Sequence, residues 1–457
     1  MSQTSAMFNL QAILALIIVP TLTSSLSADT VELISPNPQT NSAFGSAVAA
    51  VPDLNGDGLD DFLVSAPSED ILGFTDVGLV RVYSGANGSL IRAHAGPLGL
   101  NFTRLGSRLA GIADINQDGR GDYLVAAPNE NAPGGRVYVY SGGQGTLIRS
   151  HVSPNAEPDG YFGASVASLG DINGDGINDY IIGAVGESNG VTSDAGRVYI
   201  YSGANGALIR QHTSPSAQTS GAFGNAVSGI PDVSSDGRDD YIVGAPGESA
   251  MFSPPGSGRA HIFDGATGAL RHTIGSPNPS QGGGFGFAVA GTLDVFGSGL
   301  GDVVVGAPFE PLTIGSTTLA EGGRAYVFSG SSGTVGATLT EPSAQQTAFA
   351  AFGMSVATVA DMDADGYPEV LIGCPLRDRV YRFNAVDDLF SLHSTYLCPD
   401  SIGSSSFGSS IAALRDANAD GRGDILIGAP SGDNAPNDPA GSGRAYLYRP
   451  VYNDSCG

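Results

Sequence analysis

Six short segments of the chain place oxygen-bearing side chains at one fixed spacing. In each nine-residue segment, positions 1, 3, 5 and 9 carry Asp, Asn, Ser or Glu, and position 6 is Gly. Hard oxygen ligands at alternating positions, wrapped by a sharp turn that Gly permits, are what Ca²⁺ coordination requires. The sequence therefore predicts up to six Ca²⁺ ions. The predicted ligands are Asp53, Asn55, Asp57 and Asp61; Asp114, Asn116, Asp118 and Asp122; Asp171, Asn173, Asp175 and Asp179; Asp232, Ser234, Asp236 and Asp240; Asp361, Asp363, Asp365 and Glu369; Asp416, Asn418, Asp420 and Asp424.

Two other interpretations of these segments compete with a calcium-binding loop. An EF-hand has a bidentate Glu at position 12, whereas position 12 here is always Val or Ile, which excludes that site. Metal-free turns remain an alternative, because Asp and Asn favour turns by themselves. Nineteen of the predicted ligands are carboxylates, and their mutual repulsion favours a bound cation. A seventh segment, residues 294–302, lacks carboxylate or amide side chains at positions 3 and 5, so we expect no metal there.

The segments are part of a longer repeat. A Phe-Gly pair, or Leu-Gly in one copy, stands nine residues before each position-1 Asp, and a triplet such as Gly-Ala-Pro ends fourteen residues after that Asp. This 23-residue interval has the same length in all copies, which indicates a structural unit with variable loops attached. The seven copies start at Phe44, Leu105, Phe162, Phe223, Phe285, Phe352 and Phe407.

Each copy is expected to form four short strands. In the second copy, residues 107–113, 122–127, 136–140 and 146–151 are apolar runs or alternate with period two, and polar or Gly-rich turns separate them. Seven such units predict an all-β fold, a seven-bladed β-propeller of four-stranded blades. The last copy lacks a fourth strand, and residues 30–35 resemble one. We therefore expect this N-terminal strand to complete the seventh blade and close the ring.

Three regions follow from this reading. Residues 1–28 resemble a secretory signal peptide, with an apolar run ending near residue 19 and small residues before Asp29. Residues 29–449 form the propeller, and residues 450–457 are a C-terminal tail. We expect a secreted or extracellular protein, or a periplasmic one in a Gram-negative bacterium. Whether Cys398 and Cys456 form a disulfide stays open.

Charge excludes some partners. The formal net charge is −25, and all 20 basic residues are Arg. Nucleic acids and anionic membranes bind cationic faces, so neither is expected as a partner. The N-terminal apolar run is too short for a membrane span, and we expect none elsewhere in the chain.

The repeated Phe-Gly, the Asp-x-Asn-x-Asp-Gly-x-x-Asp loop and Gly-Ala-Pro resemble the FG-GAP repeats of the integrin α-subunit N-terminal propeller. The resemblance covers about residues 30–449, with departures at Leu105, Val185 and Cys374. It implies that Ca²⁺ loops on one face brace the blades, while ligands meet loops on the opposite face.

Several further residues recur in most copies. A Glu two residues after the triplet and an Arg opening the third strand predict an ion pair within a blade; a ligand-binding polar ring is the alternative. Arg-Gly-Asp at residues 120–122 and 422–424 matches an adhesion signal, but both Asp side chains are predicted metal ligands. His94, His151 and His212, with Arg92, Arg149 and Arg210, are expected to lie on exposed outer strands.

The sequence favours a non-catalytic extracellular binding or cell-adhesion module for a protein or glycan ligand. The alternative is a secreted hydrolase or polysaccharide lyase that uses the ligand face, but no catalytic constellation breaks the repeat. We expect ligand contacts on the loops between second and third strands, at residues 68–78, 186–196, 247–258, 309–323 and 431–443. Phe74 and Phe252 are the candidate contact residues.

Overall fold

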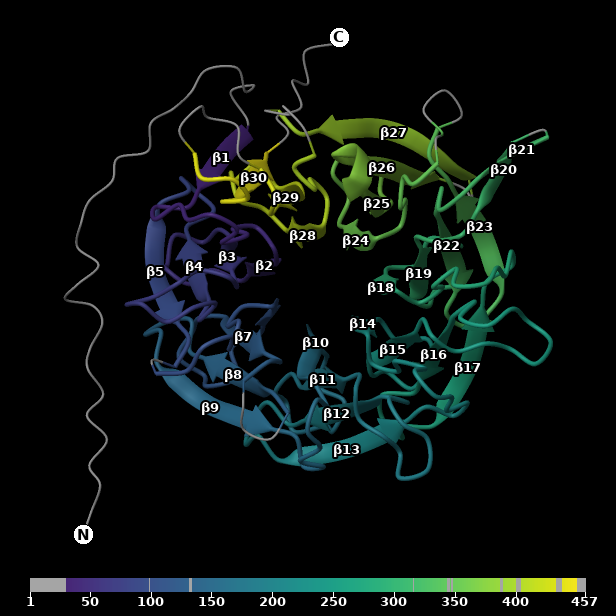
Figure 1. The fold of residues 1–457 in the computed structure, drawn as a ribbon, viewed down its shortest axis with the longest axis horizontal. Helices are drawn as coiled ribbons and strands as arrows, with labels where there is room; N and C mark the ends of the chain where they lie inside the picture. The colour runs from purple at the N-terminus through teal and green to yellow at the C-terminus, as the bar shows by residue number, and fades with distance from the viewer. Residues whose placement is uncertain are drawn as a thin grey trace.

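The computed structural model describes residues 30–97, 99–130, 134–314, 316–342, 346, 348–386, 389–399, 404–432 and 438–449. In this part of the chain, seven four-stranded antiparallel sheets stand around one axis (Figure 1). The predicted all-β, seven-bladed propeller is confirmed. The predicted signal peptide, the C-terminal tail and Cys456 lie outside the described residues.

The blades follow the sequence repeats. Blade one holds β2 (Val48–Val51), β3 (Asp61–Ala66), β4 (Leu79–Tyr83) and β5 (Leu90–Ala95). Blade two holds β6 (Arg108–Ile112), β7 (Asp122–Ala127), β8 (Arg136–Tyr140) and β9 (Leu147–Val152). Blade three holds β10 (Phe162–Ser168), β11 (Tyr180–Ala184), β12 (Arg197–Tyr201) and β13 (Leu208–Thr213). Blade four holds β14 (Ala226–Ile230), β15 (Asp240–Ala245), β16 (Arg259–Phe263) and β17 (Leu270–Gly275).

The last three blades add small variations. Blade five holds β18 (Ala288–Thr292), β19 (Asp302–Ala307), β22 (Arg324–Ser329) and β23 (Val335–Leu339), with a hairpin of β20 (Leu312–Ile314) and β21 (Thr317–Leu319) in one loop. Blade six holds β24 (Ser355–Val359), β25 (Glu369–Cys374), β26 (Arg379–Val386) and β27 (Leu389–Leu397), with a 3-10 turn η2 (Pro375–Arg377). Blade seven holds β28 (Ser410–Leu414), β29 (Asp424–Ala429), β30 (Arg444–Tyr448) and β1 (Thr30–Ile34).

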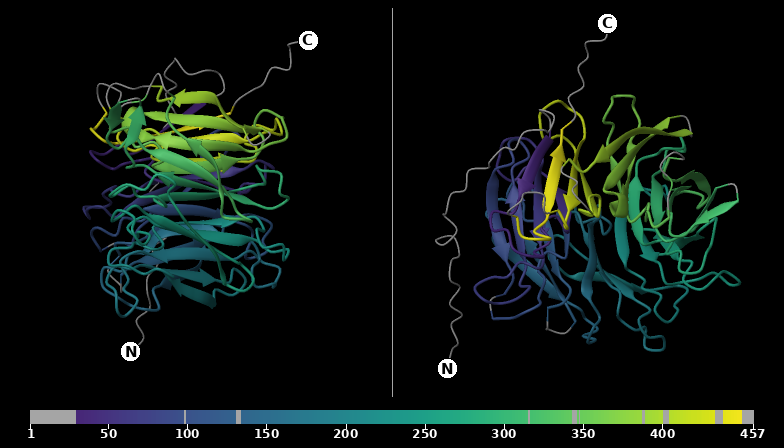
Figure 2. Two further views of the ribbon diagram at one scale, coloured as in Figure 1. Left: turned by 90° about the vertical axis from the view of Figure 1, so that its right-hand side faces the viewer. Right: turned by 45° about the horizontal axis from the view of Figure 1, so that its top comes forward.

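The N-terminal strand closes the ring as predicted. β1 pairs antiparallel with β30, from Thr30 opposite Tyr448 to Ile34 opposite Arg444. Figure 2 shows β1 beside the last strands of the chain. The side chain of Glu32 forms an ion pair with Arg444, and Leu33 is 5% exposed within the core. One blade therefore joins the two ends of the propeller.

The hydrophobic core lies between the blades rather than at the axis. Seven clusters of buried apolar side chains each join two neighbouring blades. The repeated Phe side chains are fully buried, and Leu105 fills the same role in blade two at 1% exposure. Because apolar burial is the main driving force for folding, each blade is stabilised by its neighbours on both sides.

The Gly of the Phe-Gly pair is required by backbone geometry. Gly45 has φ +89°, and a Cβ atom there would lie 2.0 Å from the carbonyl oxygen of Arg444 in the neighbouring blade. The same left-handed conformation recurs at the Gly of the other six copies. Only Gly adopts this conformation without strain while the two backbones approach so closely.

The outer strands connect neighbouring blades, and here one expectation was wrong. His94, His151 and His212 are half-buried, and their rings lie 2.6–2.8 Å from the hydroxyls of Tyr123, Tyr180 and Tyr241 in the next blade. Arg92 likewise donates to the carbonyl oxygen of Gly143, and Arg210 to that of Ala266. The repeats show that these residues recur. They contact the neighbouring blade instead of facing solvent because the blades pack against one another, which the sequence of a single repeat does not show.

Candidate metal loops

The seven Asp-rich loops lie on one face of the propeller, because each joins the innermost strand of its blade to the second strand. The position-1 Asp follows the innermost strand, and the position-9 acid lies at the start of the second. Asp61, for example, is the first residue of β3. The fold thus brings the predicted ligands of each loop together within that loop, and it keeps the loops of different blades separate.

Position 1 closes each turn through the backbone. In loop one the amide of Gly56 donates to Asp53 Oδ1 at 2.5 Å, and that of Gly58 donates to Asp53 Oδ2 at 3.0 Å. In all seven loops, the backbone amide of the position-6 Gly donates to the position-1 carboxylate. This Asp therefore shapes the turn whether or not a metal binds.

The residue at position 9 is the most deeply buried of the four predicted ligands in loop one. Asp61 is fully buried; its Oδ2 accepts from the amide of Leu54 at 2.8 Å, and its Oδ1 accepts from the amide of Gly85 at 3.0 Å. Burial raises the pKa of Asp61 to about 6, with a smaller contribution from the carboxylates of Asp57 and Asp53 and against the two amide hydrogen bonds, which lower it. The acids of one loop repel one another, and a bound divalent cation would relieve that repulsion.

Positions 3 and 5 distinguish the loops from ordinary turns. In loop one the Asn55 amide donates to Asp57 Oδ2 at 2.9 Å, and Asp57 also accepts from the hydroxyl of Ser84 at 3.3 Å. The turn between the third and fourth strands, which contains Ser84, thus lies against the loop. Because every side chain at positions 1, 3, 5 and 9 offers oxygen, the donor sets of loops one to four, six and seven fit Ca²⁺ chemically.

Loop five lacks part of this donor set. Asp294 and Asp302 make the same backbone contacts as their counterparts, accepting from Ser298 at 2.9 Å and from Val295 at 2.8 Å. Position 3 is Phe296, whose ring packs edge-on against Phe390 of blade six. The turn forms without a carboxylate or amide side chain at positions 3 and 5, where Ser298 offers only a hydroxyl. This donor set does not fit a calcium ion.

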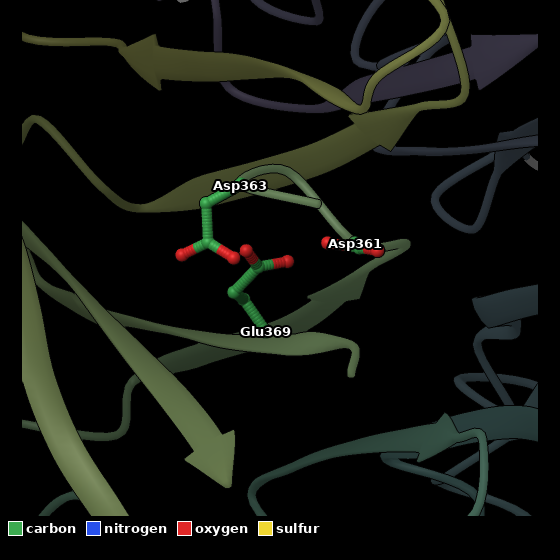
Figure 3. A group of neighbouring side chains, drawn as sticks. All are labelled: Asp361, Asp363 and Glu369. Carbon is green, nitrogen blue, oxygen red and sulfur yellow. The ribbon is translucent and has the colours of Figure 1, made fainter. Parts of the chain in front are cut away.

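In loop six all four predicted ligands are acidic. Asp361, Asp363 and Glu369 each place a carboxylate oxygen within 4.8 Å of the others, and Figure 3 shows the three side chains facing one another. Among the described residues, no other loop brings three acidic side chains this close. Both oxygens of Glu369 accept from the amide of Met362, at 3.0 and 2.9 Å.

The recurring Glu and Arg residues form the predicted pairs in blades two, three and five, whereas in blade four Glu248 lies 3.0 Å from His261 instead. Arg136 donates to Glu130 at 2.8 Å, and Arg324 donates to Glu310 at 3.0 Å. In blade one, Arg81 takes this role from a position two residues further along and pairs with Glu69 at 2.8 Å. These Glu side chains are buried and satisfied by the protein, which does not fit a ligand-binding ring.

The two Arg-Gly-Asp sequences are not displayed as free motifs. Asp122 and Asp424 are fully buried, and both accept hydrogen bonds from backbone amides inside their loops. Arg120 reaches across to the preceding blade, where its Nη1 lies 2.9 Å from Asp53 Oδ2. Sequence reasoning did not foresee this contact between neighbouring loops, because the residues are far apart along the chain.

The opposite face carries exposed apolar side chains on the loops between second and third strands. Leu72 is 71% exposed, Val191 95%, Met251 82% and Phe252 99%. Phe74 is half-buried, so this candidate contact residue is less available than the sequence suggested, and Leu312 in the loop of blade five is buried at 7%. Val191 was not singled out from the sequence, since an isolated Val in a loop carries no signal.

A pocket of about 420 Å³ opens on this same face, where the innermost strands of blades one to four begin. Its lining includes Arg104, Arg108, Asn129, Tyr161 and Asn225. Arg104 is paired with Asp76 at 3.0 Å. Arg108 is the one charged residue in the seven innermost strands, all of which are described.

Seven four-stranded blades with an Asp-rich loop on one face define the class of protein: a β-propeller built from a repeated loop-bearing blade. The chain carries FG-GAP repeats. It matches the FG-GAP repeat over residues 44–83 and 407–448, and the FG-GAP-like repeat over residues 114–182.

Relatives with similar sequences are integrin alpha chains. Mouse integrin alpha-2 is 36% identical over 162 residues, which is 33% of this chain and 13% of that protein. Xenopus laevis integrin alpha-4 is 39% identical over 152 residues, or 31% of this chain and 14% of that protein. Mouse integrin alpha-IIb is 32% identical over 201 residues, or 41% of this chain and 18% of that protein. The matched stretches thus span less than a fifth of these relatives, and the propeller of this chain is integrin alpha-like. The described residues include no helix long and apolar enough to cross a membrane.

Proposed function

We propose that this chain is an extracellular adhesion or ligand-binding module, without catalytic activity, whose ring is braced by calcium ions in its Asp-rich loops. The proposal is supported by the integrin alpha-like FG-GAP propeller and by the oxygen donor sets of the loops. Calcium would bind Asp53, Asn55, Asp57 and Asp61 in loop one and the corresponding residues elsewhere. The charge of the ion would offset the negative charge of the carboxylates, and the ion would hold together the two strands that each loop connects.

The ligand would meet the face opposite these loops. The observation that carries this assignment is the exposure of Phe252 and Met251 at 99% and 82% on the loop of blade four. Large apolar side chains held in water by a rigid scaffold are typical of contact surfaces for a protein or glycan. Leu72 and Val191 extend the same surface along blades one and three.

The nearby pocket would add a polar contact. Arg108 is exposed in this pocket, and its guanidinium donates to the carbonyl oxygen of Ser107 at 2.8 Å. A guanidinium can bind a carboxylate through two parallel hydrogen bonds. Nothing in the described part of the molecule favours the alternative of a secreted hydrolase or polysaccharide lyase.

A binding screen tests this proposal. Glycan and extracellular-protein arrays, probed with the protein in millimolar calcium, should identify a ligand. Phe252→Ala should then weaken binding about tenfold or more, while the melting temperature stays near that of the wild type. The matched control is Leu293→Ala, which removes a 56% exposed Leu from the face of the Asp-rich loops. Loss of binding in the Leu293 variant, with normal binding by the Phe252 variant, would contradict the assignment of faces.

A further inference from the structure

Blade six places a buried cation beside its acidic loop. In the third strand of the other six blades, the residue paired with position 11 of the loop is aliphatic: Val82, Val139, Ile200, Ile262, Val327 and Leu447. In blade six the same register position, opposite Leu371, is Arg382. Its side chain is 1% exposed, so a guanidinium has replaced an apolar side chain inside the blade.

The guanidinium lies at the loop's acidic group. Arg382 Nη2 is 3.4 Å from Asp363 Oδ2, and Nη1 is 3.7 Å from the sulfur of Met362. Asp363 also accepts from Asn384 Nδ2 at 2.5 Å, and His393 Nδ1 lies 3.6 Å away. One oxygen of the position-3 carboxylate, Asp363 Oδ2, is therefore engaged by side chains of the third and fourth strands, while Oδ1 is buried without a hydrogen-bond partner among the described residues.

Besides Arg382, three other features of blade six differ from the other blades. The position-9 residue is Glu369 instead of Asp, and among the described residues its carboxylate accepts hydrogen bonds from the amide of Met362 alone. In blades one to five, by contrast, the position-9 Asp also accepts from a Gly in the turn between the third and fourth strands. In blade six, β26 and β27 pair as far as Val386 and Leu389. Asn384 stands where blades one to three have a Ser that donates to position 5.

The close approach of three carboxylates requires a positive charge, and Arg382 supplies one. An arginine in a protein stays protonated. A calcium ion at Asp363 would take the carboxylate that faces a buried guanidinium, and it would leave two like charges close together where water screens them poorly. The donor set of loop six suits calcium by residue type, but its surroundings do not.

We propose that loop six holds no calcium, because Arg382 provides its cation from within the chain. The inference rests on the proposed binding of calcium by the other loops. It predicts five bound ions, in loops one to four and seven, rather than the six that the sequence suggested. The blade would then be braced in the same way with or without calcium in the medium.

Counting ions tests the inference directly. Equilibrium dialysis of the full chain against calcium, with metal analysis, should give five ions for the wild type and six for Arg382→Leu. The matched control is Arg377→Leu, which removes an exposed Arg from the same blade and should leave the count at five. A wild-type count of six, unchanged in Arg382→Leu, would overturn the inference.

A second pair of variants does not depend on the stability of Arg382→Leu. Asp365→Ala, at position 5 of loop six, should leave the count unchanged, whereas Asp57→Ala, at position 5 of loop one, should lower it by one. Loss of one ion from Asp365→Ala would overturn the inference. A count of zero in the wild type would instead overturn the calcium proposal.

Thermal melting in EGTA then tests whether Arg382 stabilises the acidic side chains of loop six when no calcium is present. The Arg382→Leu variant should melt at least about 5 °C below Arg377→Leu, because it leaves the acidic group without a counter-charge. Equal melting temperatures would show that Arg382 does not compensate the acids.

Discussion

At the scale of single residues, the acids of the loops have two separable roles. Asp294, in the loop without a full donor set, accepts from the amide of the position-6 Gly, as Asp53 does in loop one. Its other oxygen accepts from the position-5 amide of Ser298, where Asp53 accepts from the position-4 amide of Gly56. The acids at positions 1 and 9 therefore shape the turn, and the side chains at positions 3 and 5 would complete the proposed metal site. This explains why loop five keeps its first and last Asp although it has lost the middle ligands.

Two alanine substitutions separate these roles. Asp175→Ala should lose one bound calcium ion, because it removes the position-5 carboxylate of loop three. Asp294→Ala should lose none, yet it should lower the free energy of unfolding by about 1–3 kcal/mol, since backbone amides lose their acceptor. Metal analysis and denaturant unfolding of both variants are the measurements. An unchanged ion count in Asp175→Ala would argue for metal-free turns.

The residue types of the loops were readable from the sequence, but their surroundings were not. Alternating oxygen side chains in a Gly-containing turn predict donor positions because the ligands are local in sequence. The contact between Arg120 and Asp53, or between Arg382 and Asp363, depends on how a distant strand packs. Arg382 did leave a signal, a charged residue where six aligned strands have Val, Ile or Leu. It becomes meaningful only when the register of the strands is known.

At the scale of strands, the histidines between blades make stability depend on pH. Burial lowers the pKa of His94, His151 and His212 to about 4, from an ordinary value near 6.5. Below pH 6.5 the unfolded chain binds protons at these residues before the folded chain does. Their contribution to folding is therefore fully present above pH 6.5 and is lost as the pH falls toward 4.

Replacing one of these histidines tests that dependence. His151→Gln should lose less stability than the wild type between pH 7 and pH 5, because Gln does not titrate. The acids at position 9 titrate in the same range, so the difference between the two proteins is the quantity to compare. Thermal melting at both pH values measures it, and parallel curves would show that His151 is not protected from protonation.

The closing strand β1 gives a prediction of its own. Removing residues 29–36 should leave β30 with an unpaired edge and remove Leu33 and Glu32 from blade seven. An exposed edge invites pairing with another chain, so we expect aggregation or a much lower melting temperature. The substitution Leu33→Asp should act in the same direction without shortening the chain, since Leu33 packs in a cluster with Phe44. A monomeric deletion variant of normal stability would contradict the role of β1.

At the scale of the whole molecule, calcium should stabilise the ring by mass action. Extracellular sites bind calcium with dissociation constants of about 10⁻⁴–10⁻³ M. At about 1 mM calcium, each site would add about 0.4–1.4 kcal/mol to the free energy of unfolding. Several sites together should produce a clear fall in melting temperature when EGTA is added. An unchanged melting temperature after complete chelation would contradict the calcium proposal.

The overall architecture was more accessible from the sequence than the surface was. The 23-residue interval occurs seven times, which predicts seven blades. Residues 30–35 resemble the fourth strand that the last copy lacks, which predicts how the ring closes. Exposure on the face opposite the Asp-rich loops was predicted less well: Phe252 is exposed as expected, while Phe74 is half-buried. Loop side chains follow no periodic pattern, so only the folded loop determines which of them face water.

Closure by β1 also has a consequence in time. Blades one to six each pair strands that follow one another along the chain, so each can form as soon as its own four strands are available. Blade seven must join Thr30 to Tyr448, and pairing between such distant residues is intrinsically slow. We therefore expect completion of the ring to be a late step of folding. Until it occurs, the molecule carries an open sheet edge at β30, and this interval is when the chain is most exposed to misassembly with its own copies.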